Sequence, residues 1–264
     1  MILHAGVQGE YSDFEAGGES ALNSLAAAMW GGLGASALLV GAVIAMFRKP
    51  SERMTGMVMA FGSGTLISAI AYELIPESTL GKGAGMGIAF IIGALTFFLG
   101  DLFIDRLGGA SRKSIGDCET DGSGTAIFLG TLLDGVPESL ILGIGLGLGG
   151  SVSIAFLVAV FVSNIPEGVA GTVSLQREGH SRRTILFMWS CLLLASAVAA
   201  GLGYLFTQML DAIDGQYMQA FAAGAMLTML ADTMMPEAFK YGGKIVGIIT
   251  VFGFLAAAVL SVVE

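Results

Sequence analysis

The stretch Leu133-Asp134-Gly135-Val136-Pro137-Glu138-Ser139 recurs in variant form as Val162-Ser163-Asn164-Ile165-Pro166-Glu167-Gly168, and this pair decides how the rest of the chain is interpreted. Each copy lies near the middle of an apolar segment that contains no lysine or arginine. Residues four positions apart share one face of a helix. Asp134 therefore lies on the same face as Glu138, and Ser163 lies on the same face as Glu167. The pair therefore predicts two helices that present a cluster of oxygen atoms, and such a cluster requires a cation or protons.

Pro137 and Pro166 add backbone oxygens to this cluster. A proline inside a helix has no N–H to donate to the carbonyl four residues earlier, so the carbonyls of Leu133 and Val162 become available as ligands. The small polar side chains of the second copy are equally typical of hydrogen bonding between membrane helices. The predicted metal ligands are Asp134, Glu138, Ser163, Asn164 and Glu167.

The composition is that of a membrane protein. Of the 264 residues, 55% are hydrophobic and only 12% are charged, and the mean hydropathy is +0.81. A helix needs about 20 mostly apolar residues to span a bilayer. Eight stretches meet this requirement, at approximately 24–47, 54–76, 84–104, 124–148, 152–175, 184–207, 217–238 and 244–263. The 40 glycines allow close contact between helices, so the predicted fold is an all-α polytopic membrane bundle in the lipid bilayer.

We expect a single membrane domain with polar segments at its start and near its middle. The N-terminal segment is acidic and is expected to be a disordered tail. The predicted parts are an acidic extracytoplasmic tail over 1–23, spans one to three over 24–104, a cytoplasmic loop over 105–123, central spans four and five over 124–175, and spans six to eight over 184–263.

The basic residues indicate the orientation. Eleven of the 12 lysines and arginines lie on one side of the predicted spans, and only Lys82 lies on the other. By the positive-inside rule, both termini are then extracytoplasmic in the cell (inner) membrane. The net charge of -9 and the absence of a basic stripe argue against nucleic acid as a partner.

Spans two and seven contain a second repeat. The segment Ala60-Phe61-Gly62-Ser63-Gly64 matches Ala220-Phe221-Ala222-Ala223-Gly224, and the residue numbers differ by 160 without a gap as far as Glu77 and Glu237. Span two runs outward and span seven runs inward, so the repeat is inverted. Spans four and five are likewise opposed, which predicts a 3+2+3 inverted-repeat arrangement of eight helices. Secondary transporters have this organisation, with the substrate site near the midplane.

Acidic residues within the spans indicate a path for cations. Each charge inside a bilayer costs roughly 2.5 to 3.5 kcal/mol on insertion scales, so six of them require an explanation. The six are Glu73, Asp101, Asp134, Glu138, Glu167 and Asp232, and Glu77, Asp105 and Glu237 lie at span boundaries. We interpret Glu73 and Glu77 as the outer part of the path, and Asp232 and Glu237 as its inner part. The alternative is that these acids are protonated and hydrogen-bonded between helices, or that they solvate helix ends.

The two motifs resemble those of the ZIP divalent-metal transporters. Members of that family carry a His-Asn-x-Pro-Glu-Gly-like motif in span four and a related polar-polar-Ile-Pro-Glu/His-Gly motif in span five, which together hold a metal. Asp134 is at the histidine position of the first motif, and Ser163 and Asn164 are at the polar pair of the second. Glu138 and Glu167 are at the acidic positions. The resemblance covers all eight spans and includes Leu74-Ile75-Pro76-Glu77 at the end of span two.

Departures from the family pattern concern the metal. No predicted span contains histidine, and span six has no acid where some members place a ligand of a second metal. Oxygen ligands favour hard cations such as Mn, Mg and Ca. Zinc, the commonest substrate of the family, also binds carboxylates. The expected substrate is therefore a divalent metal, zinc or manganese, and no prosthetic group is expected. The resemblance also implies a homodimer in which spans one, four, five and six move against the others.

Functions of other classes fit the residues less well. An intramembrane aspartyl protease requires Tyr-Asp and Gly-x-Gly-Asp, and the nearest match is Phe98-Leu99-Gly100-Asp101 with Asp134 as partner. A zinc metalloprotease requires His-Glu-x-x-His on a helix. A structural membrane protein has no use for acids repeated in inverted copies. A proton or cation channel is the nearest alternative within transport. The sequence thus predicts a transporter that moves divalent metal cations toward the cytoplasm, and not an enzyme.

Overall fold

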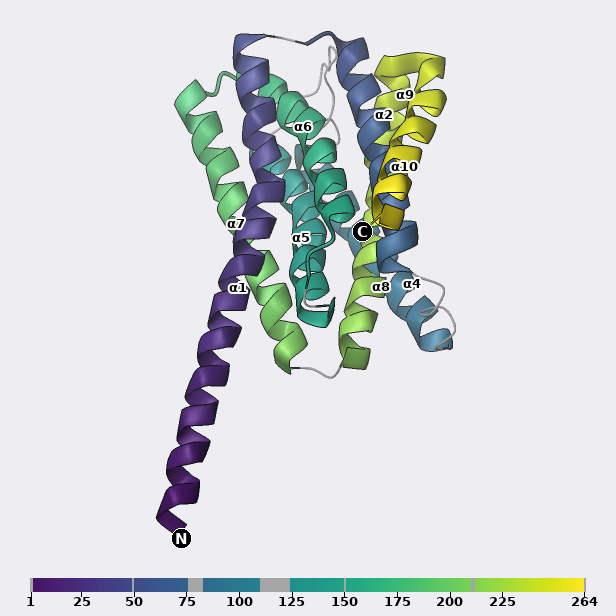
Figure 1. Cartoon of the computed structure of the whole chain (residues 1–264). Coiled ribbons are helices and arrows are strands. Elements are labelled where there is room, and N and C mark those ends of the chain that lie inside the picture. The colour runs from purple at the N-terminus through teal and green to yellow at the C-terminus, as the bar shows by residue number, and fades with distance from the viewer. Residues whose placement is uncertain are drawn as a thin grey trace.

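The computed structural model describes residues 2–48, 50–75, 83–109, 124–149, 151–209 and 212–263, and every regular element in these ranges is helical (Figure 1). The all-α prediction is confirmed for this part of the chain. The elements are α1 (Ile2–Phe47), α2 (Glu52–Ala69), η1 (Ile70–Leu74), α4 (Ala84–Ile104), η2 (Asp105–Gly109), α5 (Gly124–Gly149), α6 (Ile154–Arg177), α7 (Arg182–Met209), α8 (Ala212–Met229), η3 (Leu230–Met234), α9 (Met235–Gly242), η4 (Gly243–Ile245) and α10 (Val246–Val263).

Helix boundaries follow local capping chemistry. The side chain of Ser51 accepts a hydrogen bond from the backbone N–H of Met54 at 3.2 Å, and Ser153 accepts one from Phe156 at 3.0 Å. These contacts cap the first turns of α2 and α6, whose N–H groups have no partner within the helix. After α6 the chain turns at Gly179, where φ is 85°, a value that favours glycine.

Seven segments of the described chain are long and apolar enough to cross a membrane, which identifies an integral membrane protein. They are Ser20–Phe47, Glu52–Leu74, Ala84–Leu107, Phe128–Leu148, Ile154–Arg177, Arg182–Met209 and Gly215–Val263. The last segment has 49 residues and includes α8, α9 and α10. The chain reverses direction after α9 (Figure 1), at Gly243 with φ 70°. The sequence predicts two spans within this segment, at 217–238 and 244–263.

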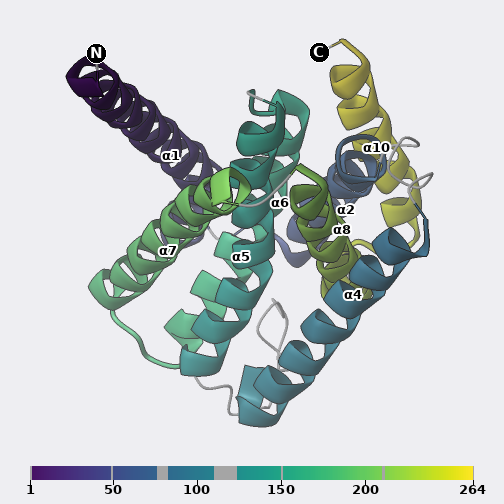
Figure 2. The same ribbon diagram turned by 90° about the horizontal axis from the view of Figure 1, so that it is seen from below.

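The helices pack as two groups. In the first, α1, α5, α6 and α7 contact mainly one another. In the second, α2 packs on α9 and α10, and α4 packs on α8. Figure 2 shows the two groups side by side, and the main contact between them is that of α2 with α6. The two proline motifs are in the first group, whereas both copies of the 160-residue repeat are in the second.

The 160-residue repeat extends to the backbone geometry. The bounds of α8 and η3 differ from those of α2 and η1 by the same 160 positions. Both η1 and η3 are π-helical turns, and each closes with an N–H donated five residues back, from Ile75 to Ile70 and from Met235 to Leu230. In the sequence a proline follows each turn two residues later, at Pro76 and Pro236. A proline ring clashes with the carbonyl four residues earlier in a regular helix, and a wider turn relieves such a clash. Figure 1 shows that α2 and α8 run in opposite directions.

The backbone of α1 is helical from Ile2, whereas the sequence analysis expected a disordered tail over 1–23. In Figure 1 the start of this helix extends well beyond the rest of the bundle. Extension of an existing helix adds one hydrogen bond for each residue ordered, so a stable apolar helix can propagate into a polar segment. The composition of the segment indicated polarity correctly but not its backbone conformation.

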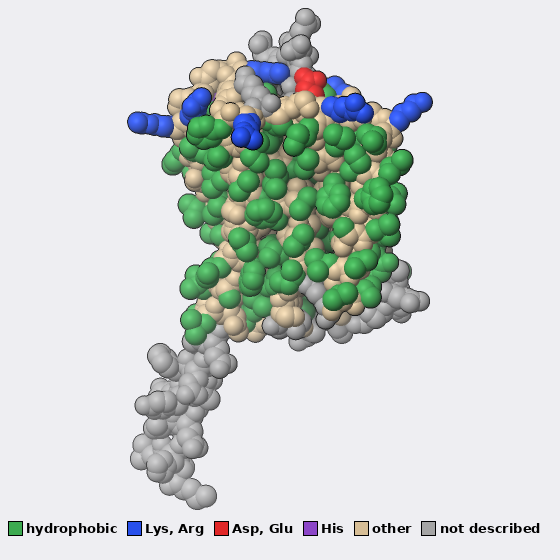
Figure 3. All heavy atoms as spheres, turned by 45° about the horizontal axis from the view of Figure 1, so that its top comes forward, with side chains coloured by type: hydrophobic (Ala, Val, Ile, Leu, Met, Phe, Trp, Pro, Cys, Tyr) green, Lys and Arg blue, Asp and Glu red, His purple; other side chains and the backbone are tan. Residues whose placement is uncertain are grey.

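The described basic residues gather at one end of the bundle. They lie in the connection from α1 to α2 and at the start of α2, in η2, at the connection from α6 to α7, and in α9 and η4. Figure 3 shows lysine and arginine side chains along the upper rim above a broad apolar surface. The N-terminus lies at the opposite end (Figure 1). We refer to the end with the lysines and arginines as the basic end.

Candidate functional site

The five predicted ligands lie on α5 and α6, and the bundle buries all of them. Asp134 and Glu138 on α5 are each 1% exposed, and Ser163, Asn164 and Glu167 on α6 are 0%, 3% and 4% exposed. Both prolines lie inside their helices, as predicted, so each helix contains a carbonyl with no helical N–H partner. Three acids are therefore held inside an apolar bundle, where ionised carboxylates require compensation.

The motif on α6 is held closely by two neighbouring helices. A β-carbon placed on Gly62 of α2 would lie 2.8 Å from the Cα of Ser163. A β-carbon placed on Gly41 of α1 would lie 2.3 Å from the carbonyl oxygen of Ile165. Only glycine permits these approaches, because any side chain would force the backbones apart. The position of the α6 motif thus depends on glycines in α1 and α2.

Hydrogen bonds use part of the polar capacity of Ser163 and Asn164. The Nδ2 of Asn164 donates to the carbonyl of Gly34 on α1 at 3.5 Å, and the Oγ of Ser163 donates to the carbonyl of Val160 at 2.9 Å. Asn164 thus makes the bond to a neighbouring helix that the sequence predicted as the alternative role, whereas Ser163 bonds within α6. These bonds leave the amide oxygen of Asn164 and the hydroxyl oxygen of Ser163 able to accept or coordinate.

Within the described residues, no three side chains of His, Cys, Asp or Glu are arranged to hold one metal ion. The acids Asp134, Glu138 and Glu167 are thus not gathered as a three-carboxylate site in this conformation. Their combination with Ser163 and Asn164 in one metal site stays a prediction.

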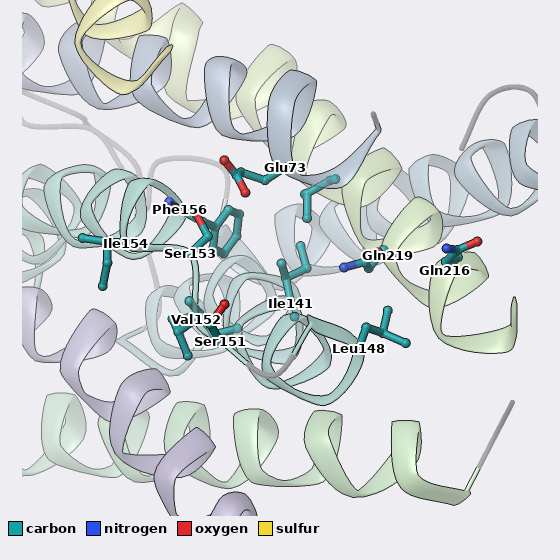
Figure 4. Close-up of a pocket in the computed structure, with 13 residues that line it drawn as sticks. Glu73, Ile141, Leu148, Ser151, Val152, Ser153, Ile154, Phe156, Gln216 and Gln219 are labelled. Atoms are coloured by element: carbon teal, nitrogen blue, oxygen red, sulfur yellow. Dashed lines mark hydrogen bonds between the residues drawn. The ribbon is translucent and has the colours of Figure 1, made fainter. Parts of the chain in front are cut away.

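A cavity of about 560 Å³ opens at the end of the bundle opposite the basic end. It is formed by η1, the end of α5, the beginning of α6 and the beginning of α8 (Figure 4). We call it the outer cavity. Its polar lining residues are Glu73, Ser151, Ser153, Gln216 and Gln219. Leu142 also lines it and lies one helical turn from Glu138 on α5, so the cavity approaches the buried acids.

Glu73 is the acid of the outer cavity. The hydroxyl of Ser261 on α10 donates a short hydrogen bond to its Oε1. In Figure 4 the carboxylate of Glu73 lies on the same side of the cavity as Ser153 and Phe156. The structure therefore brings this predicted path residue to a polar cavity and fixes one of its two oxygens.

The other predicted path residues do not line this cavity. Asp232 is exposed on η3, and Glu237 on α9 has its Oε1 3.9 Å from the Nζ of Lys240. The second oxygen of Glu237, Oε2, is buried and has no hydrogen-bond partner among the described residues. Glu77 lies outside the described residues. Asp101 is 8% exposed on α4.

The two glutamines of the outer cavity were not predicted as site residues from the sequence. Gln216 and Gln219 lie three residues apart on α8 and so share one face. Their spacing near the start of an apolar span was a usable signal, because two amides on one face of a membrane helix favour a polar lining. Ser68 was also missed. It is buried on α2, and its Oγ has no hydrogen-bond partner among the described residues.

Comparison with known proteins identifies one informative relative. The chain is 26% identical over 217 residues to an Arabidopsis thaliana protein named "Putative zinc transporter". The alignment covers 78% of this chain and 33% of the relative, so the chain spans about one third of that protein's length. No protein-family model matches the chain. The similarity relates this integral membrane protein to a protein named for metal-ion transport.

Proposed function

We propose that this protein transports divalent metal cations across the membrane toward the cytoplasm, and that Asp134, Glu138, Ser163, Asn164 and Glu167 bind the metal. The observation that carries the proposal is the burial of three acids in two helices that each contain a proline. Three ionised acids inside a bilayer would cost on the order of 8 kcal/mol on insertion scales. That is comparable to the whole stability of a typical domain, and one bound divalent cation would lower this cost for all three acids.

The proposed site combines carboxylates with neutral oxygens. Because no three acidic side chains converge in the described part of the chain, we propose that the hydroxyl of Ser163, the amide oxygen of Asn164 and the two proline-freed carbonyls complete the coordination. Oxygen donors suit manganese and other hard cations, and the name of the Arabidopsis thaliana relative favours zinc. We therefore propose zinc or manganese as the substrate.

We propose that the metal enters through the outer cavity. Glu73 supplies a carboxylate there, and the cavity reaches Leu142, one turn from Glu138. Leu142 and Phe156 are buried in the apolar core and line the same cavity, so they close the route to the acids in this conformation. Glu77 is proposed to join Glu73 on the outer side, and Asp232 and Glu237 to lie on the route to the cytoplasm.

The proposed architecture has eight membrane spans in a 3+2+3 inverted repeat, with both termini extracytoplasmic. It treats α8 and α10 as separate spans, and the reversal of the chain after α9 supports this division. The clustering of basic residues at one end supports a cytoplasmic location for that end. The two packing groups correspond to the sets of spans that the family resemblance implies as moving and fixed parts. We propose that they move relative to each other in a homodimer.

Uptake by the purified protein in liposomes tests the function. We expect saturable accumulation of Zn²⁺ or Mn²⁺, and counterflow of labelled metal when the liposomes are preloaded with unlabelled metal. Counterflow distinguishes a carrier from a channel. Glu138→Gln and Glu167→Gln should each abolish uptake but leave the protein monodisperse, because loss of a buried charge removes its desolvation cost.

Two results would contradict the proposal. If both glutamine variants accumulate metal at the wild-type rate, the binding site lies elsewhere in the protein. If the wild-type protein moves no metal from a panel of divalent cations, but passes protons or monovalent cations without saturation, the protein is a channel. Glu178→Gln, in the connection after α6, is the matched control for loss of one carboxylate outside the bundle interior.

A further inference from the structure

An apolar groove runs along the side of the bundle between α4, α5 and α8. Its volume is about 510 Å³. We call it the lateral groove. Its lining residues include Ile92, Thr96, Leu133, Val136, Pro137 and Tyr217. Three of these residues, Leu133, Val136 and Pro137, belong to the first proline motif, so the groove borders the helix turn that carries Asp134 and Glu138.

The lining excludes water as a stable occupant. Only Thr96 and Tyr217 bring side-chain oxygen atoms to it, and the hydroxyl of Thr96 already donates to the carbonyl of Ile92 at 2.8 Å. A buried water needs two to four polar partners, which this surface does not offer. An empty space of this size would deprive its lining of dispersion contacts. The occupant must therefore be apolar.

The position of the groove identifies the source of that occupant. The groove is continuous with the apolar surface that faces the bilayer, because Ile92 on its edge is 51% exposed and Phe221 is 36% exposed. Along α5 it extends from Leu133 to Ile144, about 16 Å at 1.5 Å per residue. This is close to half of the roughly 30 Å hydrocarbon core, the depth of one leaflet. Tyr217 lies toward the end opposite the basic end, as tyrosines at membrane interfaces do.

The inverted repeat shows that the groove is an open version of a contact that is closed elsewhere. Ala222 on α8 corresponds to Gly62 on α2, since their numbers differ by 160. Gly62 lies directly against the backbone of Ser163 on α6. Ala222 instead borders the groove, across which lie Val136 and Pro137 of α5. The α5 and α8 surfaces thus leave a space where the equivalent pair of helices is in contact.

We propose that the lateral groove binds one acyl chain of a membrane phospholipid from the leaflet at the end opposite the basic end. The chain packs against Leu133, Val136 and Pro137 of α5 and against the facing residues of α8. This inference does not depend on the proposed transport of metals, since it rests on the shape, lining and position of the groove.

Photolabelling of the full chain in lipid nanodiscs tests the site. The probe is a phosphatidylcholine that carries a diazirine within one acyl chain, and labelled residues are located by peptide mass spectrometry. We expect labelling of the 133–144 segment of α5 together with the 217–225 segment of α8. Labelling confined to the outward surface of α7, at residues such as Leu194 and Val198, would overturn the proposal, because it reports only lipid that surrounds the bundle.

Matched variants separate a bound chain from surrounding lipid. Thr96→Phe and Val136→Phe place a ring in the groove from opposite walls, and each should lower labelling of α5 by about tenfold, because the side chain occupies the same space. Val198→Phe adds the same bulk on the exposed face of α7 and should leave labelling of α5 unchanged. Thr96 is at the surface, so that variant is expected to fold even if the Val136 variant does not.

Three results would overturn the inference. Equal labelling of α5 in the wild type and in Thr96→Phe would show that no chain occupies the groove. Covalent capture of a second copy of the protein across the groove would assign it to an interface between subunits. Labelling by a short-chain detergent probe that equals labelling by the phospholipid in the same nanodiscs would show a non-selective apolar surface.

Discussion

The contact of Gly62 with the α6 motif predicts that replacing this glycine by alanine impairs transport more than it impairs stability. The new β-carbon would lie 2.8 Å from the Cα of Ser163, whereas carbon atoms in good contact are about 3.5 to 4.0 Å apart. The two helices must therefore separate by about 1 Å. Added volume at a packed position typically costs about 1 to 3 kcal/mol. Alanine recovers about 1 kcal/mol of helix propensity relative to glycine, so the expected loss of stability is only about 0 to 2 kcal/mol.

The same displacement acts directly on the proposed metal ligands Ser163 and Glu167. Misplacement of reacting groups by about 1 Å can cost on the order of 100-fold in rate, and we expect the maximal rate of metal uptake in Gly62→Ala to fall by about 10- to 100-fold. Thermal unfolding, monitored by size-exclusion chromatography, measures stability. Uptake of metal into liposomes measures transport. Gly87→Ala on α4 is the matched control, because nothing lies within 4 Å of a β-carbon there. Wild-type uptake in Gly62→Ala would refute the argument that the contact of α2 with α6 positions the site.

Three further variants test other parts of the site and the bundle. Asp134→His should raise the ratio of Zn²⁺ to Mn²⁺ uptake, because imidazole favours borderline metals, and an unchanged ratio would mean that Asp134 does not contact the metal. Glu73→Gln should raise the external metal concentration needed for half-maximal uptake, and this effect should be smaller at high salt. Glu237→Gln should instead lower the maximal rate of uptake. If the two variants show identical uptake kinetics that do not depend on salt, neither residue lies on the path. Thr172→Val should lower stability by about 1 to 3 kcal/mol because it leaves the buried Nε1–H of Trp189 without its acceptor at 2.8 Å, and Thr172→Ser should not.

Much of the fold could be predicted because membrane helices have a strong compositional signal. The apolar stretches, the mid-helix positions of Pro137 and Pro166, and the burial of Asp134, Glu138 and Glu167 all follow from hydropathy and helix periodicity. These features depend on short segments of sequence, which is why one sequence suffices to find them.

Contacts between helices were less predictable. With 40 glycines in the chain, nothing in the sequence distinguishes Gly62, which touches another backbone, from Gly87, which faces open space. The outer cavity was missed for the same reason, since it depends on how the ends of α5, α6 and α8 meet around η1. The proposed binding of one metal by these acids is also beyond prediction from sequence, because it depends on side-chain positions across two helices.

The π-helical turns η1 and η3 show that the 160-residue repeat preserves an irregularity of the backbone as well as residue types. In both η1 and η3 the first and fifth residues are buried and the second and third are exposed, although most of the residues differ between the two copies. A π-helical turn interrupts the regular i to i−4 hydrogen bonds, so each copy has an irregular turn at the same distance from its start. Because the helices are inverted, η1 lies beside the outer cavity, whereas η3 leads into α9 at the basic end. Under the proposed function, each side of the membrane thus has one such turn that contains an acid of the path. The acid is Glu73 in η1 and Asp232 in η3. The acids inside the turns are not at equivalent positions, since Glu73 corresponds to Thr233. Within the turns the repeat therefore preserves the backbone irregularity and not the charge, and the charge that it does preserve, at Glu77 and Glu237, comes three residues after each turn.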